Sequence, residues 1–378
     1  MTSTFDPANQ RVDALTRTTR ALLKAISEDH QGLVELRRRW ELVEAKPVFL
    51  VSRDEGDDAS WVGLDIRTLL RGEDSAGRFS VHDMIVAPGA ELPPHYHKDA
   101  YTYVLVGSGS LRLQAGSVVE KVGANDFAFV PPQTRFGFRN TSDEPASLIV
   151  IYSPAGADRA FDEAHRYWLA THDERESSYL QILEHYGFRF DGETLDNDVK
   201  TNVAVSTVEF EFTKLGDLER VREAFADRPA VPRIVKTSSA EIAAVTTTGK
   251  TFRKAVVTGD ASGGQAMVHL LANEAGGLFA PPHHQTSEEE FFFIRRGEVE
   301  VVCGSESGPV RAGAFAFAPR NGTHGFKVSG AAGGAEFFTL NSPAGHERAL
   351  AVLRELDAAG APKEQKDAMT VAGGWIMH

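Results

Sequence analysis

The chain has 378 residues, of which 42% are hydrophobic and 25% are charged, an ordinary composition for a globular protein with one large or two smaller domains. Its formal net charge of −13 argues against a general nucleic-acid binder and against an anionic membrane surface as partner, because both roles need a basic face. No stretch approaches the roughly 20 apolar residues of a membrane span, and no apolar signal segment opens the chain. A single cysteine, Cys303, excludes an intrachain disulfide and favours a reducing compartment, so we expect a cytoplasmic protein.

The N-terminal segment, residues 1–46, is predicted to be helical. Apolar residues recur every three or four positions from Val12 to Ile26, and a break separates this helix from a second short one over 33–43. From 47 onward the pattern changes to short runs of alternating apolar and polar residues divided by Gly, Pro, Asn and Asp. Such runs are typical of antiparallel strands, so we predict a β domain over 47–156.

The second half of the chain is predicted to repeat this order. A charged helical stretch over 157–186 and the polar run "DGETLDNDVKTN" form a helical connector and linker, 157–200. The β pattern resumes near Val203, which predicts a second β domain over 201–345. A short amphipathic helix over 347–358 and a tail without a clear pattern make up 346–378.

The two β domains are related copies of one unit. His95 and His283 are 188 positions apart, and Pro131 and Pro319 are separated by the same 188 positions. The tetrapeptide "SPAG" occurs at Ser153 and again 189 positions later. A near-constant offset of this kind indicates an internal duplication.

The second copy contains a set of candidate metal ligands. Side chains at positions i and i+2 of a strand share a face, so His283 and Gln285 point the same way. Glu290 begins the next strand, in which Phe292 shares its face, and a hairpin brings His324 back toward both. Two imidazoles and a carboxylate leave coordination positions open, which suits Fe(II), with Mn, Ni, Co or Zn as alternatives.

These motifs resemble those of the cupin superfamily in its two-barrel, bicupin form. The resemblance implies a mainly β fold of two tandem double-stranded β-helix (jelly-roll) barrels, with an N-terminal helical segment and connecting helices. It also implies that His283, Glu290 and His324 bind a divalent metal ion. Gln285 stands where the family has another histidine, so it is either a fourth, weaker ligand or a group that orients a bound water. We take Gln285 and Glu290 as the candidate catalytic residues. The matching positions of the second copy are Gly277, His283, Gln285, Glu290, Gly297, Gly313, Pro319, Gly322 and His324.

The first copy departs further from the family pattern. His95 and His97 keep the histidine pair, but Ala100 stands where the carboxylate is expected and Phe136 where the last histidine is expected. Two neutral imidazoles alone make a poor catalytic site for a divalent ion. We therefore predict a degenerate site here, in a structural barrel or in a pocket gated by Phe136, and keep a second metal as the alternative.

The roles of several other residues near the motifs are also predicted from the sequence. His82 and His269 lie 13 and 14 positions before the first ligand of each copy and could face the pocket as acid–base groups, although packed strand histidines are expected. Glu288 and Glu289 are expected to be solvated loop carboxylates. Cys303 ends an apolar run and is expected to be a buried, inert thiol.

The resemblance implies a metal-dependent dioxygenase that acts on an aromatic or enolisable small molecule. Quercetin 2,3-dioxygenases and gentisate-type ring-cleaving dioxygenases are bicupins of this kind. One alternative is a non-oxidative metalloenzyme, such as an isomerase, decarboxylase or cyclase, and another is a non-catalytic small-molecule-binding bicupin. Oxalate decarboxylase fits least, because it would need a small polar pocket and two complete sites. The expected partners are a small-molecule substrate, O2 and further copies of the chain in a homo-oligomer, with no nucleic acid and no membrane.

Overall fold

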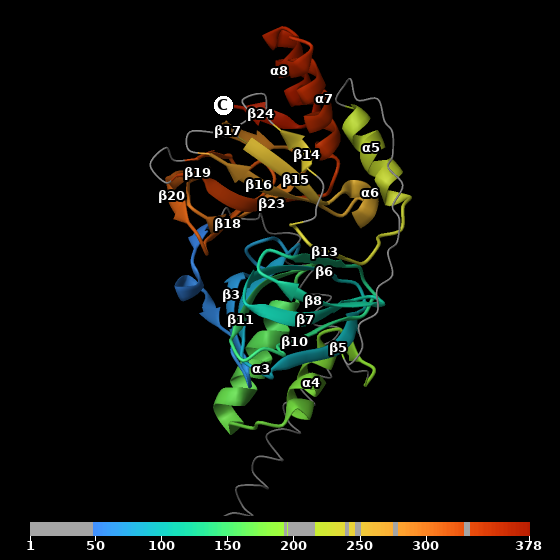
Figure 1. Ribbon diagram of the computed structural model, residues 1–378, viewed down its shortest axis with the longest axis vertical. Helices are drawn as coiled ribbons and strands as arrows, with labels where there is room; N and C mark the ends of the chain where they lie inside the picture. The colour runs from blue at the N-terminus through green and yellow to red at the C-terminus, as the bar shows by residue number, and fades with distance from the viewer. Residues whose placement is uncertain are drawn as a thin grey trace, which may run out of the picture.

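The computed structural model describes residues 48–192, 195, 216–238, 242–245, 251–274, 279–328 and 333–378. The N-terminal helices expected over 1–46 and most of the linker expected over 191–202 lie outside these residues. The described chain forms two β barrels stacked end to end, with the helices at the outer ends and along one side (Figure 1). The prediction of a mainly β, two-barrel fold is confirmed.

The first barrel consists of two antiparallel sheets. One has the strand order β13-β9-β6-β11-β4-β3-β2 and the other the order β12-β5-β10-β7-β8. Its strands are β2 (Asp57–Asp58), β3 (Leu64–Leu70), β4 (Ser80–Val86), β5 (Glu91–His97), β6 (Tyr101–Ser108), β7 (Ser110–Ala115), β8 (Val118–Gly123), β9 (Phe127–Val130), β10 (Phe136–Arg139), β11 (Ala146–Ser153), β12 (Phe188–Phe190) and β13 (Arg233–Val235), with a 3-10 turn η1 (Arg53–Glu55) before β2.

The second barrel has the same two-sheet plan. Its sheets have the orders β1-β21-β18-β23-β16-β15-β14 and β20-β19-β22-β17-β24. Its strands are β1 (Val48–Val51), β14 (Ile242–Val245), β15 (Thr251–Val257), β16 (Met267–Asn273), β17 (Phe279–Gln285), β18 (Glu289–Arg296), β19 (Glu298–Cys303), β20 (Glu306–Arg311), β21 (Phe315–Ala318), β22 (His324–Val328), β23 (Ala335–Ser342) and β24 (Trp375–Met377).

The two barrels exchange edge strands. β1 precedes the first barrel in the chain but pairs with β21 of the second, and β13 leads into the second barrel but pairs with β9 of the first. Each exchanged strand extends one of the two seven-stranded sheets, and these sheets pack against each other. The exchange therefore ties both halves of the chain into one folded body.

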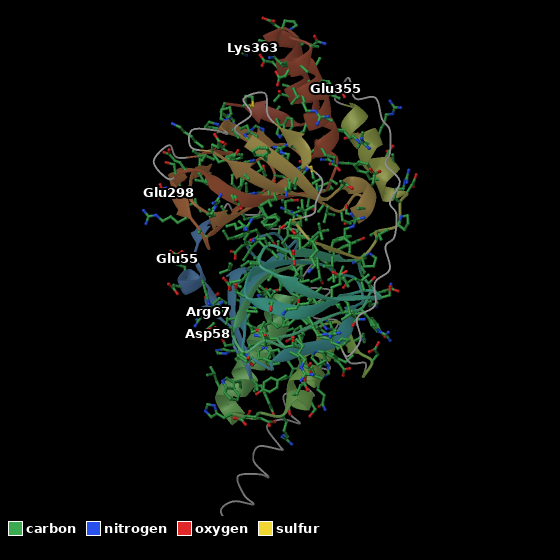
Figure 2. All side chains as sticks on the ribbon, viewed as in Figure 1. Glu55, Asp58, Arg67, Glu298, Glu355 and Lys363 are labelled. Carbon is green, nitrogen blue, oxygen red and sulfur yellow. The ribbon has the colours of Figure 1, made fainter. Side chains whose placement is uncertain are left out.

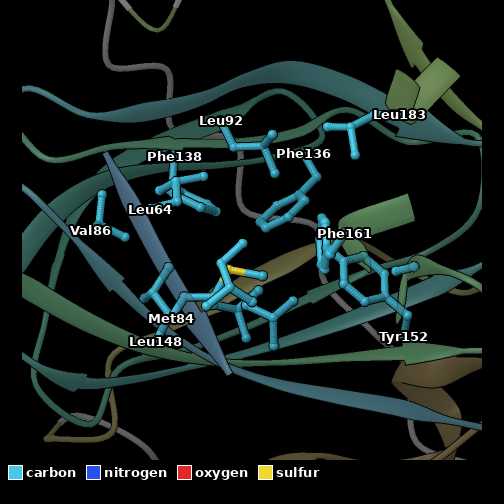
Figure 3. Close-up of a cluster of buried hydrophobic side chains, with 14 of the residues drawn as sticks. Leu64, Met84, Val86, Leu92, Phe136, Phe138, Leu148, Tyr152, Phe161 and Leu183 are labelled. Atoms are coloured by element: carbon cyan, nitrogen blue, oxygen red, sulfur yellow. The ribbon is translucent and has the colours of Figure 1, made fainter. Parts of the chain in front are cut away.

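Buried apolar clusters fill each barrel and the space between them. The first barrel encloses a cluster that includes Leu64, Met84 and Phe138 (Figure 3). In the second barrel, Phe292 lies in the interior and packs edge-to-face on Phe326. Phe291 and Phe293 point the other way, into the cluster between the barrels. This alternation confirms the prediction that only Phe292 of the three phenylalanines faces the interior with Glu290.

The helices extend the internal repeat beyond the β domains. After the first barrel come α3 (Ala157–Thr171), α4 (Glu176–His185) and β12, and after the second come α7 (His346–Ala358), α8 (Lys363–Ala372) and β24. The tail that showed no clear pattern in the sequence is thus the second copy of the 157–190 unit. The helices that end each barrel lie at opposite poles of the molecule (Figure 1).

Two helices interrupt the stretch that was predicted to be β from 203 onward. They are α5 (Gly216–Ala226) and α6 (Gly259–Ser262). Leu218, Val221 and Phe225 of α5 recur at helical spacing and are buried against α7, α8 and Met267. The prediction missed α5 because a single short helix adds little to a window dominated by strand-like runs.

Charged side chains cover the outside of the described structure. Arg67 and Asp58 form an ion pair at a sheet edge, and Glu298 pairs with Arg311 on the second barrel (Figure 2). Both pairs are solvent-exposed, so each contributes little to stability. Within the described part of the chain, no helix is both long enough and apolar enough to span a membrane.

Candidate metal centre

Three strands of the second barrel place the candidate ligands. β17 ends with His283 and Gln285, β18 contributes Glu290 as its second residue, and β22 begins with His324. His283 and His324 are direct partners in the β17–β22 ladder, and their ring centroids are 4.4 Å apart. The neighbouring Gly325 lets the strands approach closely, because a Cβ there would lie 2.7 Å from the Ala280 carbonyl oxygen.

The structure brings His283, Glu290 and His324 together. One nitrogen from each imidazole and one oxygen from the carboxylate all lie within 4.8 Å of one another, and all three residues are buried. Among the residues described, this is the one group of three or more His, Cys, Asp or Glu side chains close enough to hold a metal ion. Gln285 lies beside it, with its Nε2 donating to Glu290 Oε2 at 2.9 Å.

Backbone carbonyls orient both imidazole rings. His283 Nδ1 lies 2.9 Å from the Pro281 carbonyl oxygen, and His324 Nδ1 lies 2.8 Å from that of Gly322. We assign the ring proton to Nδ1 in each case, because a carbonyl can only accept. This tautomer leaves the Nε2 lone pairs facing the centre, which is the arrangement that metal-binding histidines use.

Two buried polar atoms show that the residues fit a divalent cation. His324 Nε2 lies 3.1 Å from Glu290 Oε2, and its Nδ1 faces the Gly322 carbonyl oxygen. Each ring nitrogen therefore faces an acceptor. A neutral ring can donate only once, whereas a cation between Nε2 and Oε2 would satisfy both atoms. Gln285 Oε1 is buried without a partner among the described residues, which is costly unless something binds it. Two imidazoles, one carboxylate and one amide oxygen form a suitable donor set for such an ion.

His283 and Glu290 are held in the protonation states that metal ligands require. Burial, with a further effect from His324, lowers the pKa of His283 to about 4, so this imidazole is neutral near pH 7. Burial alone would raise the pKa of Glu290, but the hydrogen bond with His324 and the electrostatic interactions with His324 and His283 bring it below its ordinary value. Neutral imidazoles and an ionised carboxylate are the forms that bind metal ions.

The structure contradicts the expectation that Glu288 and Glu289 are solvated, because they are 1% and 0% exposed. Glu288 accepts from Arg222 of α5 and contacts the His346 ring at the start of α7. Glu289 forms ion pairs with Arg78 of the first barrel at 2.6 Å and with Arg320 at 2.8 Å. Each carboxylate is therefore buried against a charged partner that lies far away in the sequence.

A cavity of about 280 Å³ opens from the ligand cluster. One wall comes from α7, α8 and β24, which close over the end of the second barrel. Most of the lining surface is apolar, although six polar side chains outside the ligand cluster also line the cavity. The apolar side chains include Met267, Leu271, Phe326, Leu350, Leu353 and Trp375, and the polar ones are Arg253, His269, Thr339, Asn341, His346 and Thr370.

The two strand histidines have different surroundings. His82 is fully buried and hydrogen-bonded to the Thr68 and Ser80 hydroxyls, so it is a packed strand histidine, as expected. His269 lines the cavity, and its Nδ1 is buried without a partner among the described residues. Burial, and then the positive charge of Arg253, lowers the pKa of His269 well below its ordinary value, so the ring facing the cavity is neutral.

The equivalent place in the first barrel is filled by aromatic rings. His95 Nε2 and His97 Nε2 lie 3.3 Å apart, and no described acidic residue joins them in a metal-binding group. Phe188 of β12 packs 4.3 Å from the His97 ring, and Phe136 packs 5.4 Å from the His95 ring, measured between centroids. Phe136 is a buried part of the barrel core.

Cys303 belongs to the apolar cluster of the second barrel and does not line the cavity. Burial raises the pKa of Cys303 to about 12, and its thiol donates to the Phe317 carbonyl oxygen, so it is inert as expected.

Arg253, His346 and Trp375 line the cavity but were not identified from the sequence. No motif spacing marks them; a signal for Trp375 was available in the repeat, because it lies 187 positions after Phe188.

Comparisons with known proteins agree with this architecture. A family model described as "Cupin domain" matches residues 82–152 and 270–340. Protein SchB from Streptomyces halstedii is 30% identical over 94 residues, which are 24% of this chain and 67% of that protein. Both segments matched by the family model lie within the two barrels.

Solved structures of oxalate decarboxylases share the fold. The enzyme from Lactobacillus farciminis, in complex with formate, aligns with a TM-score of 0.50 and 13% identity over 86% of this chain and 96% of its own. The enzyme from Bacillus subtilis aligns with a TM-score of 0.50 and 12% identity, over 86% of this chain and 85% of its own. At such identities, these alignments show a common fold alone.

Proposed function

The chain belongs to the cupin superfamily, with two cupin domains in tandem, and from this premise we propose that it is a metalloenzyme whose active site lies in the second barrel. The observation that carries the proposal is the convergence of His283, Glu290 and His324 beside the unpartnered Gln285 amide oxygen, at a largely apolar cavity. A divalent ion bound there would supply a Lewis-acid or redox centre with open coordination positions, and this ligand set favours Fe(II) over Mn, Ni, Co and Zn.

The reaction we favour is dioxygenation of an aromatic or enolisable small molecule. The surface of the cavity beside the ligands is largely apolar, so it can accept an apolar ring or chain. A dioxygenase transfers both atoms of O2 to the substrate, whose own electrons balance the reaction, so no separate reductant is needed. Gln285 sits against Glu290 and is placed to hold that carboxylate and to donate to an oxygen atom at the centre.

A non-oxidative metalloenzyme is the second candidate, and the polar side of the cavity favours it. His269 is neutral and presents an unpartnered nitrogen near the cavity, so it is placed to take up a proton without any need for O2. An isomerase, decarboxylase or cyclase would use the same ligands. Oxalate itself, the substrate named for the two structural neighbours, is a poor match for a mostly apolar wall and one complete ligand set.

Elemental analysis tests the metal site. Wild type purified from metal-supplemented medium should hold about one ion per chain, and His324→Ala should hold almost none, because a two-histidine, one-carboxylate site loses one of its three strong ligands. His284→Ala is the matched control: this exposed neighbour of His283 contacts His378 outside the cluster, so metal content should not change. Equal metal in wild type and His324→Ala, or about two ions per chain, would contradict the proposed single site.

Oxygen consumption separates the candidate reactions. The metal-loaded protein is screened against phenols, diketones and flavonols while O2 uptake and product are followed together. Turnover with stoichiometric O2 uptake supports the dioxygenase, and turnover without uptake supports the non-oxidative enzyme. Tight binding without turnover of any compound would instead indicate a small-molecule-binding bicupin and overturn the enzyme proposal.

A further inference from the structure

The cavity of the second barrel contains a partly buried cation that the ligand cluster does not explain. Arg253 lies on β15 and lines the cavity together with His269 and Asn341. No hydrogen bond or ion pair links its guanidinium to another residue in the described ranges. Arg222, which is also partly buried, does have such partners, because it contacts Glu288, Ser287 and the Ala344 carbonyl.

An unpaired guanidinium at this depth is energetically unfavourable. Burial lowers the pKa of Arg253, and the negative charge of Glu290 offsets this only in part. The group nevertheless stays charged, because arginine does not lose its proton in proteins. Charges removed from water are normally paired in proteins, so a bound ligand is the expected partner of Arg253.

A bound divalent ion would change the net charge of the cavity. Without a metal ion, the opposite charges of Arg253 and Glu290 cancel. A divalent ion contributes two further positive charges, so the loaded cavity carries an excess of two. Since a largely apolar site stabilises such an excess poorly, a ligand that brings negative charge is favoured.

The rest of the lining defines the body of that ligand. Leu350 and Leu353 of α7, Phe326 of β22 and Trp375 of β24 give the cavity an apolar wall. With a volume of about 280 Å³, the cavity is at the small end of ligand sites. A single guanidinium fork matches one carboxylate with two parallel hydrogen bonds, whereas a phosphate dianion would need further cationic donors.

We propose that the ligand of this cavity is a small carboxylic acid with an apolar body, and that Arg253 receives its carboxylate. The proposal deepens the proposed function by naming a substrate class, and it rests on that function only where the metal ion is concerned. Thr339, Asn341 and the unpartnered Nδ1 of His269 supply additional hydrogen-bonding groups on the polar side. Arg253 is then the residue that distinguishes an acid from a neutral analogue of the same shape.

Matched acids and primary amides test this preference directly. Propionate, benzoate and phenylacetate are compared with propionamide, benzamide and phenylacetamide by calorimetric titration, on metal-loaded and on chelator-treated wild type. At least one acid should bind loaded protein about tenfold or more tightly than its amide, as expected for a buried charged hydrogen bond. The preference should be smaller in metal-free protein, where Glu290 opposes the carboxylate.

Two substitutions identify the guanidinium as the source of the preference. Arg253→Met should bind acid and amide equally while keeping its metal content, and Arg253→Lys should retain part of the preference. Arg296→Met removes an arginine whose side chain is 72% exposed and is paired with Glu336, so it should behave as wild type. Circular dichroism shows whether each variant is folded.

Several outcomes would overturn the inference. If no acid in the series binds more tightly than its amide, or if folded Arg253→Met keeps the wild-type preference, Arg253 is not the carboxylate receptor. Loss of metal from folded Arg253→Met would show instead that the arginine positions Glu290. The metal-free measurement separates the two proposals: an acid preference in protein that never retains metal refutes the metalloenzyme and leaves the Arg253 assignment standing.

Discussion

Gln285 occupies the position at which an imidazole would complete a three-histidine ligand set. Its amide nitrogen donates to Glu290 at 2.9 Å, and its oxygen is buried without a partner among the described residues, so this oxygen is available to bind the proposed ion. We predict that Gln285→His tightens metal binding by about tenfold or more, because imidazole is a stronger ligand than a neutral amide oxygen. Competition against a chelator of known affinity measures the change.

Gln285→Ala is the opposite member of this pair. It removes both the amide oxygen and the hydrogen bond that holds Glu290, so metal affinity should fall by about tenfold. If this variant binds metal as tightly as wild type, the amide neither touches the ion nor orients the carboxylate. If Gln285→His binds no more tightly, position 285 does not face the centre.

The consecutive residues Glu288, Glu289 and Glu290 show where prediction from sequence stops. Strand alternation and motif spacing were enough to select Glu290 as the inward-facing carboxylate. They could not show that Glu288 and Glu289 are buried, because burial there depends on Arg222 and on Arg78, which lies 211 positions before Glu289. Arg253 was missed for the same reason, since only the assembled barrel places it at the cavity.

At the level of strands, close approach of β17 and β22 places His283 opposite His324. A Cβ at Gly325 would lie 2.7 Å from the Ala280 carbonyl oxygen, and a Cβ at the equivalent Gly137 would lie 2.9 Å from the Pro94 nitrogen. Both contacts are with backbone, so Gly325→Ala and Gly137→Ala should each push two strands apart and lower stability by about 1–3 kcal/mol.

Only one member of this glycine pair should affect the metal site. Gly325→Ala moves the strand that begins with His324, so metal affinity should fall together with stability. Gly137→Ala strains the first barrel, which contributes no ligand, so its metal affinity should match wild type. Urea denaturation and chelator competition on both variants make the comparison. Equal metal affinity in the two folded variants would show that the β17–β22 spacing does not set the ligand geometry.

The final short strand of each repeat explains why one barrel is filled and the other has a cavity. Phe188 of β12 pairs with His97, and Trp375 of β24 pairs with Gln285, at equivalent positions of the two barrels. Phe188 fills the space over the first-barrel histidines, whereas Trp375 lies at the wall of an open cavity. The repeat offset relates Phe188 to Trp375, but this equivalence can be recognised only when β12 and β24 are known to be strands.

At the scale of the whole molecule, the 188-residue offset was sufficient to predict two copies of one barrel. It carried no information on how the copies dock, because docking depends on residues that differ between them. The exchange of β1 and β13, the Arg78–Glu289 ion pair and the apolar cluster between the sheets all belong to that interface. Since these contacts join the halves, destabilisation of the first barrel should also lower the stability of the second.

Two buried histidines of the first barrel should make the whole molecule sensitive to acid. Burial, with a smaller effect from Arg71, lowers the pKa of His82 to about 3, and burial lowers the pKa of His95 to about 4. In the unfolded chain both titrate near their ordinary value of about 6.5, so below that pH the unfolded state binds more protons than the folded one. Their stabilising contribution is therefore present above about pH 6.5 and is lost as the pH falls toward 4.

The expected loss is large enough to measure by urea denaturation at pH 7, 6 and 5. Each histidine that stays neutral in the folded state should lower the free energy of unfolding by about 2 kcal/mol between pH 7 and pH 5, since one pH unit corresponds to about 1.4 kcal/mol. His82→Gln keeps a hydrogen-bonding side chain but no titrating group, so it should lose roughly 2 kcal/mol less over this interval. A variant whose stability falls as steeply as that of wild type would show that protonation of His82 does not limit the stability of the two-barrel unit in acid.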